Sequence, residues 1–333
     1  MKSILLFFLL SITTLYSSEK ISTEKSLSLE YNSTISPYFT SHKLHYFDTQ
    51  DGLKIGYKIF NVKAPKATIV ISSGRTEGMV KYQEFIYDLT QNGYSVYILD
   101  HRGQGYSSRL LKDTQIGHVK DYNNYIKDLH YFVKNIVQRK RKLILIAHSM
   151  GGAIASVYVE RYQDDFDALV LSSPMHQPEI ISNSLSSLGC KIAKKRENDI
   201  DRYIIGEGSY DDKTPFDKNI LTHSKLRYKI ADEAYEKEPE TKLGGPSVRW
   251  LAEACKMSEE SVSNAKDIKI PVLLLQAGDD KVVNKEAQDR FCEDASSYCQ
   301  KIVIDGAYHE LFIEKDDMRS KALKAILEFI PKV

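Results

Sequence analysis

The sequence predicts an α/β protein with a mostly parallel, eight-stranded sheet and helices on both faces. Two observations support this class. An antiparallel hairpin, marked by the turn residues Asp51-Gly52, opens the folded part of the chain between residues 42 and 60. Short apolar runs then alternate with helical segments, which is typical of parallel sheets. In such sheets the functional side chains gather beyond the carboxyl ends of the strands.

The remaining elements follow the hairpin in order. Each predicted strand is an apolar run bounded by polar or glycine-containing loops. A helix near the end of the strand-poor region is expected to carry Pro246 in its first turn. We expect strands at 67–73, 94–100, 143–146, 166–174, 270–277 and 300–305, and helices at 79–92, at 122–138, from Gly151 and from Pro246.

The chain divides into an N-terminal extension and a core with one insertion. Residues 1–18 have a positive start and a short apolar run, typical of a secretory signal, with an uncleaved anchor as the alternative. We therefore expect an exported protein, periplasmic or membrane-associated. Residues 19–41 are polar and predict a tether or an irregular lead-in. The core comprises 42–174 and 268–333, and the helical insertion 175–267 predicts a lid or, alternatively, a solvated helical layer without a role in binding.

The composition excludes some classes of function. Lys plus Arg number 46 and Asp plus Glu number 45, so no net field favours nucleic acid. Neither an H-E-x-x-H motif nor zinc-like cysteine spacing is present, so we expect no metal and no cofactor. Of the cysteines, Cys292 and Cys299 flank a short polar turn and are candidates for a disulfide, whereas Cys190 and Cys255 are either paired or buried thiols.

The apolar strand at 143–146 runs into Ala147-His-Ser-Met-Gly-Gly152. Small residues on both sides of Ser149 allow a tight bend from strand to helix that projects the serine side chain beyond the sheet. A helix-capping serine is the alternative interpretation. The preceding buried strand and the Gly151-Gly152 pair favour a nucleophile.

A serine nucleophile requires a base and a group that orients the base. His309 lies in a loop just past the last predicted strand and is the candidate base. Asp279 and Asp280 follow the preceding strand, and either gives the chain order serine, acid, histidine. The N–H groups of Met150 and Arg75 are the candidate oxyanion donors, because one follows the serine and the other lies after the 67–73 strand.

Five motifs together resemble the serine α/β-hydrolases, specifically the monoacylglycerol lipases and bacterial lysophospholipases. They are Ser73-Gly-Arg-Thr-Glu, Asp100-His-Arg-Gly-Gln-Gly-Tyr-Ser, Ala147-His-Ser-Met-Gly-Gly, Gln276-Ala-Gly-Asp-Asp and Gly306-Ala-Tyr-His-Glu. The bacterial lysophospholipases match more closely, through Gly74-Arg-Thr-Glu, Gly117-His-Val and Glu314-Lys-Asp-Asp-Met-Arg-Ser320. The resemblance covers roughly residues 42–331 and is weakest in the insertion. It implies an α/β-hydrolase fold with Ser149 as nucleophile, Asp280 as acid and His309 as base.

The resemblance also implies substrates. These are lysophospholipids or monoacylglycerols at a membrane surface, cleaved at the carboxylic ester through an acyl-enzyme. Arg75 is a candidate partner for a phosphate, or else it holds its own loop through Glu77. Trp250 either receives the acyl chain or belongs to the core of the lid. Two other functions stay open: a carboxylesterase for short soluble esters, and a non-catalytic lipid-binding protein on a hydrolase scaffold.

Overall fold

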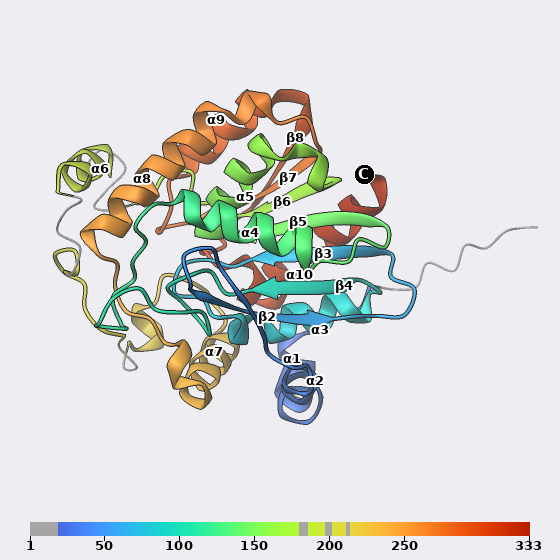
Figure 1. The fold of residues 1–333 in the computed structure, drawn as a ribbon. Helices are drawn as coiled ribbons and strands as arrows, with labels where there is room; N and C mark the ends of the chain where they lie inside the picture. Colours follow the sequence, from blue (N-terminus) through green and yellow to red (C-terminus); the bar gives the residue numbers. More distant parts are fainter. Residues whose placement is uncertain (1–18, 180–185, 197–201, 211–213) are drawn as a thin grey trace, which may run out of the picture.

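The computed structural model describes residues 19–179, 186–196, 202–210 and 214–333, and in this part of the chain the sheet has eight strands (Figure 1). Their order is β1-β2-β4-β3-β5-β6-β7-β8. The β1–β2 and β2–β4 pairs are antiparallel, and the others are parallel. The strands are β1 (His45–Asp48), β2 (Lys54–Phe60), β3 (Ala67–Ser72), β4 (Ser95–Leu99), β5 (Lys142–His148), β6 (Ala168–Ser172), β7 (Val272–Ala277) and β8 (Cys299–Ile304). The predicted class, hairpin and strands are confirmed.

Helices cover both faces of the sheet because alternate strand residues point to opposite sides. In β3, Val70 belongs to one core cluster and Ile69 and Ile71 belong to the other. The first cluster lies under α4 (Asn123–Asn135), α5 (Met150–Arg161), α8 (Val248–Ser263) and α9 (Lys285–Ala295). The second lies under α3 (Gln83–Gln91) and α10 (Asp316–Phe329).

The prediction of a tether or an irregular lead-in at residues 19–41 is wrong. This segment forms α1 (Glu24–Glu30), a π-helical turn (Tyr31–Ile35) and α2 (Ser36–Ser41). Its buried residues Leu27, Tyr31, Ile35 and Phe39 recur every fourth position. A spacing of four advances slightly more than one α-helical turn, and the wider π-helical turn takes up the excess. The polar composition of the segment hides this apolar stripe. The predicted signal at 1–18 lies outside the described residues.

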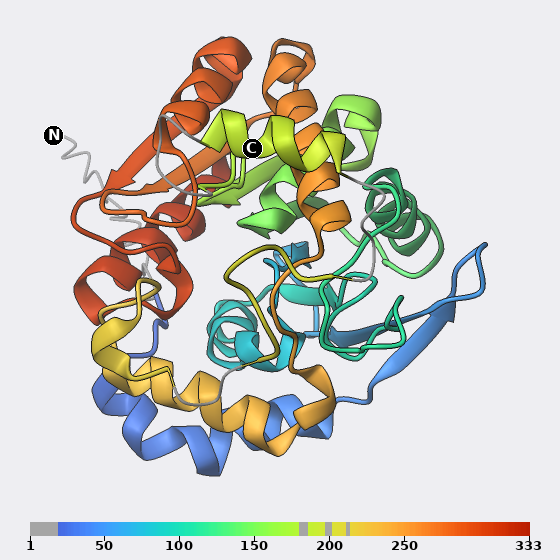
Figure 2. The same ribbon diagram turned by 90° about the vertical axis from the view of Figure 1, so that its left-hand side faces the viewer.

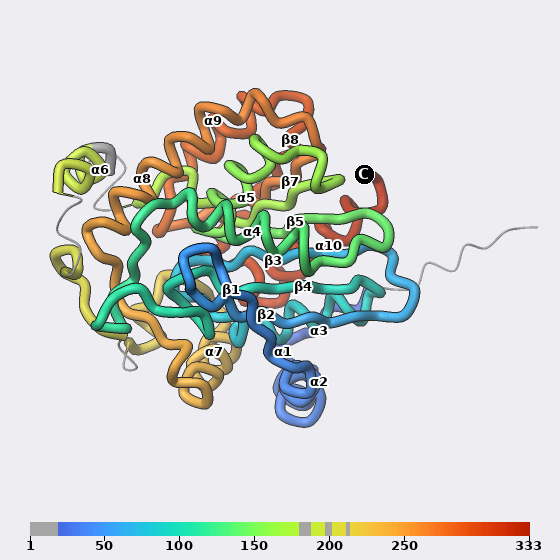
Figure 3. Tube along the Cα trace, viewed as in Figure 1, coloured from blue at the N-terminus to red at the C-terminus, as the bar shows by residue number. Residues whose placement is uncertain are grey.

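The insertion contributes α6 (Ser186–Lys195), α7 (Lys225–Lys237) and α8, which lie beyond the carboxyl ends of the strands or extend from there over the body (Figure 3). Helix α8 packs on α5 and α9, so part of the insertion belongs to the body of the protein. Helix α7 runs alongside the N-terminal helices (Figure 2). Pro246 precedes α8 instead of lying in its first turn, because Ser247 is the N-cap and accepts the N–H of Trp250.

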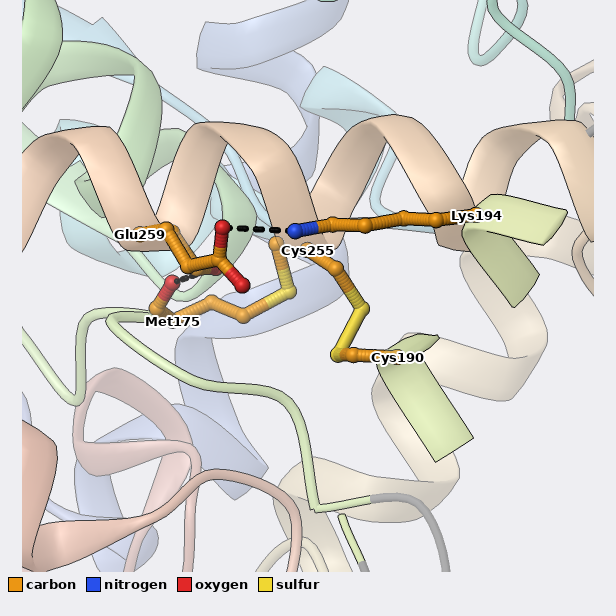
Figure 4. The surroundings of a disulfide bond; sticks show 6 residues. Met175, Cys190, Lys194, Cys255 and Glu259 are labelled. Atoms are coloured by element: carbon orange, nitrogen blue, oxygen red, sulfur yellow. Dashed lines mark hydrogen bonds and ion pairs between the residues drawn. A yellow bond between two sulfur atoms is a disulfide. The ribbon is translucent and has the colours of Figure 1, made fainter. Parts of the chain in front are cut away.

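Both cysteine pairs that the sequence left open are disulfides. Cys292 and Cys299 join α9 to β8, whereas Cys190 and Cys255 join α6 to α8 (Figure 4). The second disulfide is accompanied by an ion pair between Lys194 of α6 and Glu259 of α8. Within the described residues, no helix combines the length and apolar character needed to cross a membrane.

Candidate active site

Ser149 occupies the bend between β5 and α5. Its backbone has φ 51° and ψ −120°, a conformation that non-glycine residues rarely adopt. The bend requires α5 to approach the sheet closely. A side-chain carbon on Gly151 would lie 2.2 Å from the Ser72 carbonyl oxygen, and one on Gly152 would lie 2.6 Å from Pro174. The two glycines therefore allow the close packing that holds the serine in its strained position.

His309 and Asp280 complete a hydrogen-bonded chain with Ser149. His309 Nε2 lies 2.9 Å from Ser149 Oγ, and His309 Nδ1 lies 2.8 Å from Asp280 Oδ2. Asp280 Oδ1 accepts the N–H groups of Val282 and Val283 at 2.9 and 3.2 Å. The three predicted residues thus come together from loops after β5, β7 and β8. Asp279 is exposed and pairs with Lys281, so it does not reach the histidine.

Burial and neighbouring charge have opposite effects on the pKa values of His309 and Asp280. Burial lowers the pKa of His309, but the charge and hydrogen bond of Asp280 outweigh burial, so the pKa is raised. Burial raises the pKa of Asp280, but His309 and the two backbone N–H groups outweigh it, so that pKa is lowered. Asp280 therefore stays ionised beside an imidazole that gains a proton readily, as a serine hydrolase requires.

The two candidate oxyanion donors lie on elements next to Ser149. Met150 is the first residue of α5, where backbone N–H groups have no acceptor within the helix and the helix dipole is positive. Arg75 lies in the 73–78 loop, which follows β3, the strand paired with β5. Their role as oxyanion donors stays a prediction.

A cavity of about 300 Å³ opens onto Ser149 and His309. Much of its wall is apolar, and the insertion at 175–267 contributes to that wall. The apolar lining residues are Met175, Pro178, Ile204, Leu221, Pro246, Trp250, Leu251, Val282 and Val283. Trp250 is buried, and its indole N–H donates to the Tyr125 hydroxyl at 3.2 Å. It therefore belongs both to the hydrophobic core beneath α8 and to the cavity wall.

Arg75 also lines this cavity and an adjoining one of about 500 Å³. Its Nη1 donates to the Gly244 carbonyl at 3.0 Å, and its guanidinium lies 5.3 Å from the centre of the Trp250 ring system. The alternative that Arg75 holds its loop through Glu77 is wrong. Glu77 instead accepts the Gly74 N–H at 2.8 Å and bonds to other side chains.

A buried charged cluster beneath the site was not predicted. Lys81 pairs with Glu77 at 2.9 Å and with Glu310 at 2.5 Å. The ring of His148 lies 4.8 Å from the ring of His309, and burial lowers the pKa of His148 to about 4, so His148 is neutral. These residues come together only in the folded protein, and their spacing in the sequence does not indicate a cluster. In the part of the chain that the structure describes, no three His, Cys, Asp or Glu side chains form a group suited to a metal ion.

A serine, histidine and aspartate joined in this way at the carboxyl edge of such a sheet define a serine hydrolase of the α/β-hydrolase class. The family model described as "Serine aminopeptidase, S33" matches residues 63–316, and the chain belongs to this family.

Comparison with individual proteins gives the same class. The chain is 38% identical over 296 residues to lysophospholipase L2 of Escherichia coli strain K12, covering 85% of this chain and 86% of that protein. It is 24% identical to human monoglyceride lipase, covering 79% and 81% of the two chains. The solved structure of a soluble variant of monoglyceride lipase from Saccharomyces cerevisiae, at 20% identity, has the same fold, with a TM-score of 0.69 and coverage of 87% of this chain and 94% of that chain.

Proposed function

We propose that this protein is a lysophospholipase that hydrolyses the carboxylic ester of single-chain lipids. The observation that carries the proposal is the Ser149–His309–Asp280 chain facing a largely apolar cavity with Arg75 in its wall. The identity to lysophospholipase L2 supports the same substrate class.

The geometry supports an acyl-enzyme mechanism. Ser149 Oγ attacks the ester carbonyl while His309 Nε2 takes the serine proton, and Asp280 stabilises the imidazolium. The N–H groups of Met150 and Arg75 stabilise the oxyanion. His309 then gives its proton to the leaving alcohol. Water, deprotonated by the same imidazole, attacks the acyl-enzyme and releases the fatty acid and Ser149.

The lining of the cavity offers contacts to both ends of a lysophospholipid. The apolar wall, which includes Trp250, accommodates the acyl chain, and Arg75 offers paired donors to the phosphate. Burial lowers the pKa of Arg75 and Glu207 opposes that effect, so the guanidinium is a poorly solvated cation that gains from an anionic partner. Monoacylglycerols would use the same acyl site without this ionic contact.

The experiment is a comparison of native protein with Ser149→Ala on lysophosphatidylcholine, lysophosphatidylethanolamine, monoacylglycerol, short nitrophenyl esters and an aminoacyl-nitroanilide. Serine-dependent release of fatty acid, fastest from lysophospholipids, is expected. Activity confined to short esters would make the protein a carboxylesterase, and activity on the anilide alone would make it an aminopeptidase. Lipid binding without any hydrolysis would point to a non-catalytic lipid-binding protein.

Acyl transfer is a second part of the proposal. An acyl-enzyme reacts with any alcohol that enters in place of water. With glycerol or a phospholipid as acceptor, we expect acylated acceptor beside free fatty acid. Release of free fatty acid alone at saturating acceptor would refute this part.

We also propose that the protein is exported, with residues 1–18 as signal or anchor. Two features support export: the sequence of that segment and the two disulfides, which persist in oxidising compartments. Cell fractionation with mass determination of the N-terminus tests both localisation and cleavage. Recovery of the intact chain in the cytosol with reduced cysteines would refute it.

Association with an anionic membrane surface is the final part of the proposal, and α6 supports it. Leu188 and Ile192 are each about half exposed on this helix. Lys191, Lys195 and Arg196 are exposed beside them. The side chains of Cys190 and Ala193 are buried, and the disulfide from Cys190 to Cys255 joins α6 to α8. Apolar side chains among cations suit an anionic bilayer.

Vesicle sedimentation tests this surface. The double variant Leu188→Ser with Ile192→Ser should bind phosphatidylglycerol-containing vesicles about tenfold more weakly than native protein, because it loses two apolar contacts. Leu29→Ser, which changes an exposed leucine of α1, is the matched control. Equal binding of both variants would refute the role of α6.

A further inference from the structure

The 73–78 loop, which carries the N–H of Arg75, contains a strained residue. Thr76 has φ 61°, a left-handed conformation that a β-branched residue seldom adopts. Such a residue costs about 1–3 kcal/mol and persists only where its surroundings hold it. The shape of the loop therefore depends on the groups that bond to its backbone.

Two side chains from the first part of the core supply some of these bonds. Gln104 Nε2 donates to the carbonyl oxygens of Gly74 at 2.7 Å and Glu77 at 3.0 Å. Asp100 Oδ1 accepts the N–H of Met79, just beyond the loop, at 2.7 Å. These bonds hold the two ends of the loop but do not reach Thr76.

Tyr235 of α7 holds the middle of the loop. Its hydroxyl donates to the Thr76 carbonyl at 3.1 Å and accepts the N–H of Gly78 at 3.2 Å. The side chain is 5% exposed. A residue of the insertion thus bonds directly to the backbone beside Arg75.

Helix α7 is a rigid support for this hydroxyl. Arg227, near the start of the helix, is 1% exposed and donates to Glu84 at 2.9 Å. It also donates to the Glu314 carbonyl at 2.8 Å and to Asp316 at 2.9 Å. Separating the buried pair of Arg227 and Glu84 would leave charges unpaired at a cost of several kcal/mol, so α7 stays docked on the core.

We propose that Tyr235 is a positioning residue, whose hydroxyl fixes the strained 73–78 loop so that the N–H of Arg75 points at the oxyanion. The inference rests on the proposed function, because it requires Ser149 as nucleophile and Arg75 as donor. Without the hydroxyl, the partly buried Thr76 carbonyl and the buried Gly78 N–H lose this partner, and Thr76 can relax from its positive φ. Loss of a whole oxyanion donor costs about 100- to 1,000-fold in rate, so a displaced donor should cost about 10- to 100-fold.

The test is Tyr235→Phe, which removes only the hydroxyl. With nitrophenyl butyrate we expect kcat to fall about 10- to 100-fold with little change in KM, as for an interaction made only in the transition state. The inhibition constant of an alkyl boronic acid, which forms a tetrahedral adduct on Ser149, should rise by the same factor. The binding of a non-hydrolysable ether lysolipid, which resembles the ground state, should not change.

Tyr228→Phe is the matched control. Tyr228 also belongs to α7, and its hydroxyl donates to a backbone carbonyl, that of Thr214, at 3.2 Å. It should keep native kinetics. Equal losses in the two variants, or an unchanged boronate constant in Tyr235→Phe, would overturn the assignment. Ser149→Ala in the same assay separates the two ideas. Activity retained in Ser149→Ala would refute the proposed function. Activity lost in Ser149→Ala but native in Tyr235→Phe would refute only the role of Tyr235.

Discussion

Replacement of Asp280 by asparagine should inactivate the enzyme through the tautomer of His309. Asp280 Oδ1 accepts two backbone N–H groups, from Val282 and Val283, and Oδ2 faces His309 Nδ1. An asparagine must keep its oxygen on the two backbone donors, because the opposite orientation would place its NH₂ against them. Its NH₂ therefore faces Nδ1, which must then accept.

The substitution changes the protonation of the other ring nitrogen, Nε2. With Nδ1 accepting, the proton of neutral His309 moves to Nε2, which lies 2.9 Å from Ser149 Oγ. An Nε2–H group cannot take the serine proton. The wrong tautomer in a serine triad lowers kcat by about 10⁴-fold, or about 5.4 kcal/mol in the barrier. Most of the fold should survive, because the asparagine keeps the size of the side chain and the two backbone bonds.

The assay is steady-state hydrolysis of nitrophenyl butyrate, with Asp279→Asn as the matched control. Asp279 is exposed and pairs only with Lys281 among the ion pairs of the described residues, so its variant should stay within about twofold of native activity. A loss below tenfold in Asp280→Asn, or a larger loss in Asp279→Asn, would contradict the assignment of the acid.

Four further outcomes are expected. The raised pKa of His309 should place the acid limb of kcat/KM above pH 6.5, because only neutral imidazole accepts the serine proton. Arg75→Gln should reduce kcat/KM for lysophosphatidylcholine about tenfold more than for monoacylglycerol; an equal reduction would exclude the phosphate contact. Burial, and to a smaller extent the charge of Glu260, raises the pKa of Glu160 to about 9. The free energy of unfolding therefore falls as pH rises from about 4.5 to 9, because the unfolded chain releases this proton first. Glu160→Gln should raise Tm more at pH 8 than at pH 5. Phe39→Ala should cost about 3–5 kcal/mol in urea unfolding, against little for exposed Leu29→Ala.

The parts of the protein that could be predicted are those with a short-range signal. The strands from β3 to β7 are apolar over most of their length because both faces of the sheet are covered. Ser149, Asp280 and His309 follow the ends of strands β5, β7 and β8, and parallel strands bring their carboxyl ends to one edge. The choice between Asp279 and Asp280 needed the family resemblance, because neighbouring acids on a turn look alike in the sequence.

What could not be predicted depends on contacts between distant segments. The N-terminal helices are polar in composition, and their apolar stripe only has meaning once Leu226 and Ile230 of α7 are placed beside it. The cysteines of the α6–α8 disulfide are 65 residues apart. Nothing in their local sequence separates a pair from two buried thiols. Helix α7 is held by a buried ion pair from Arg227 to Glu84 of α3 and a partly exposed one to Asp316 of α10, and no periodicity in the sequence indicates these pairs.

The two strained residues of the site illustrate the same distinction. Ser149 and Thr76 both have positive φ, and each is the neighbour in sequence of a proposed oxyanion donor, Met150 or Arg75. The residues that allow the strained backbone of Ser149, Gly151 and Gly152, lie within three positions of it, so the sequence alone indicates a bend there. The loop of Thr76 has local bonds too, from the Thr76 hydroxyl to the Arg75 carbonyl and from the Gly74 N–H to Glu77. The Thr76 carbonyl, however, is bonded by Tyr235, 159 residues away and in the least family-like part of the chain. Strain at a catalytic turn requires a support somewhere. Where part of that support comes from a distant segment, as it does for Thr76, only the structure identifies the residue that supplies it.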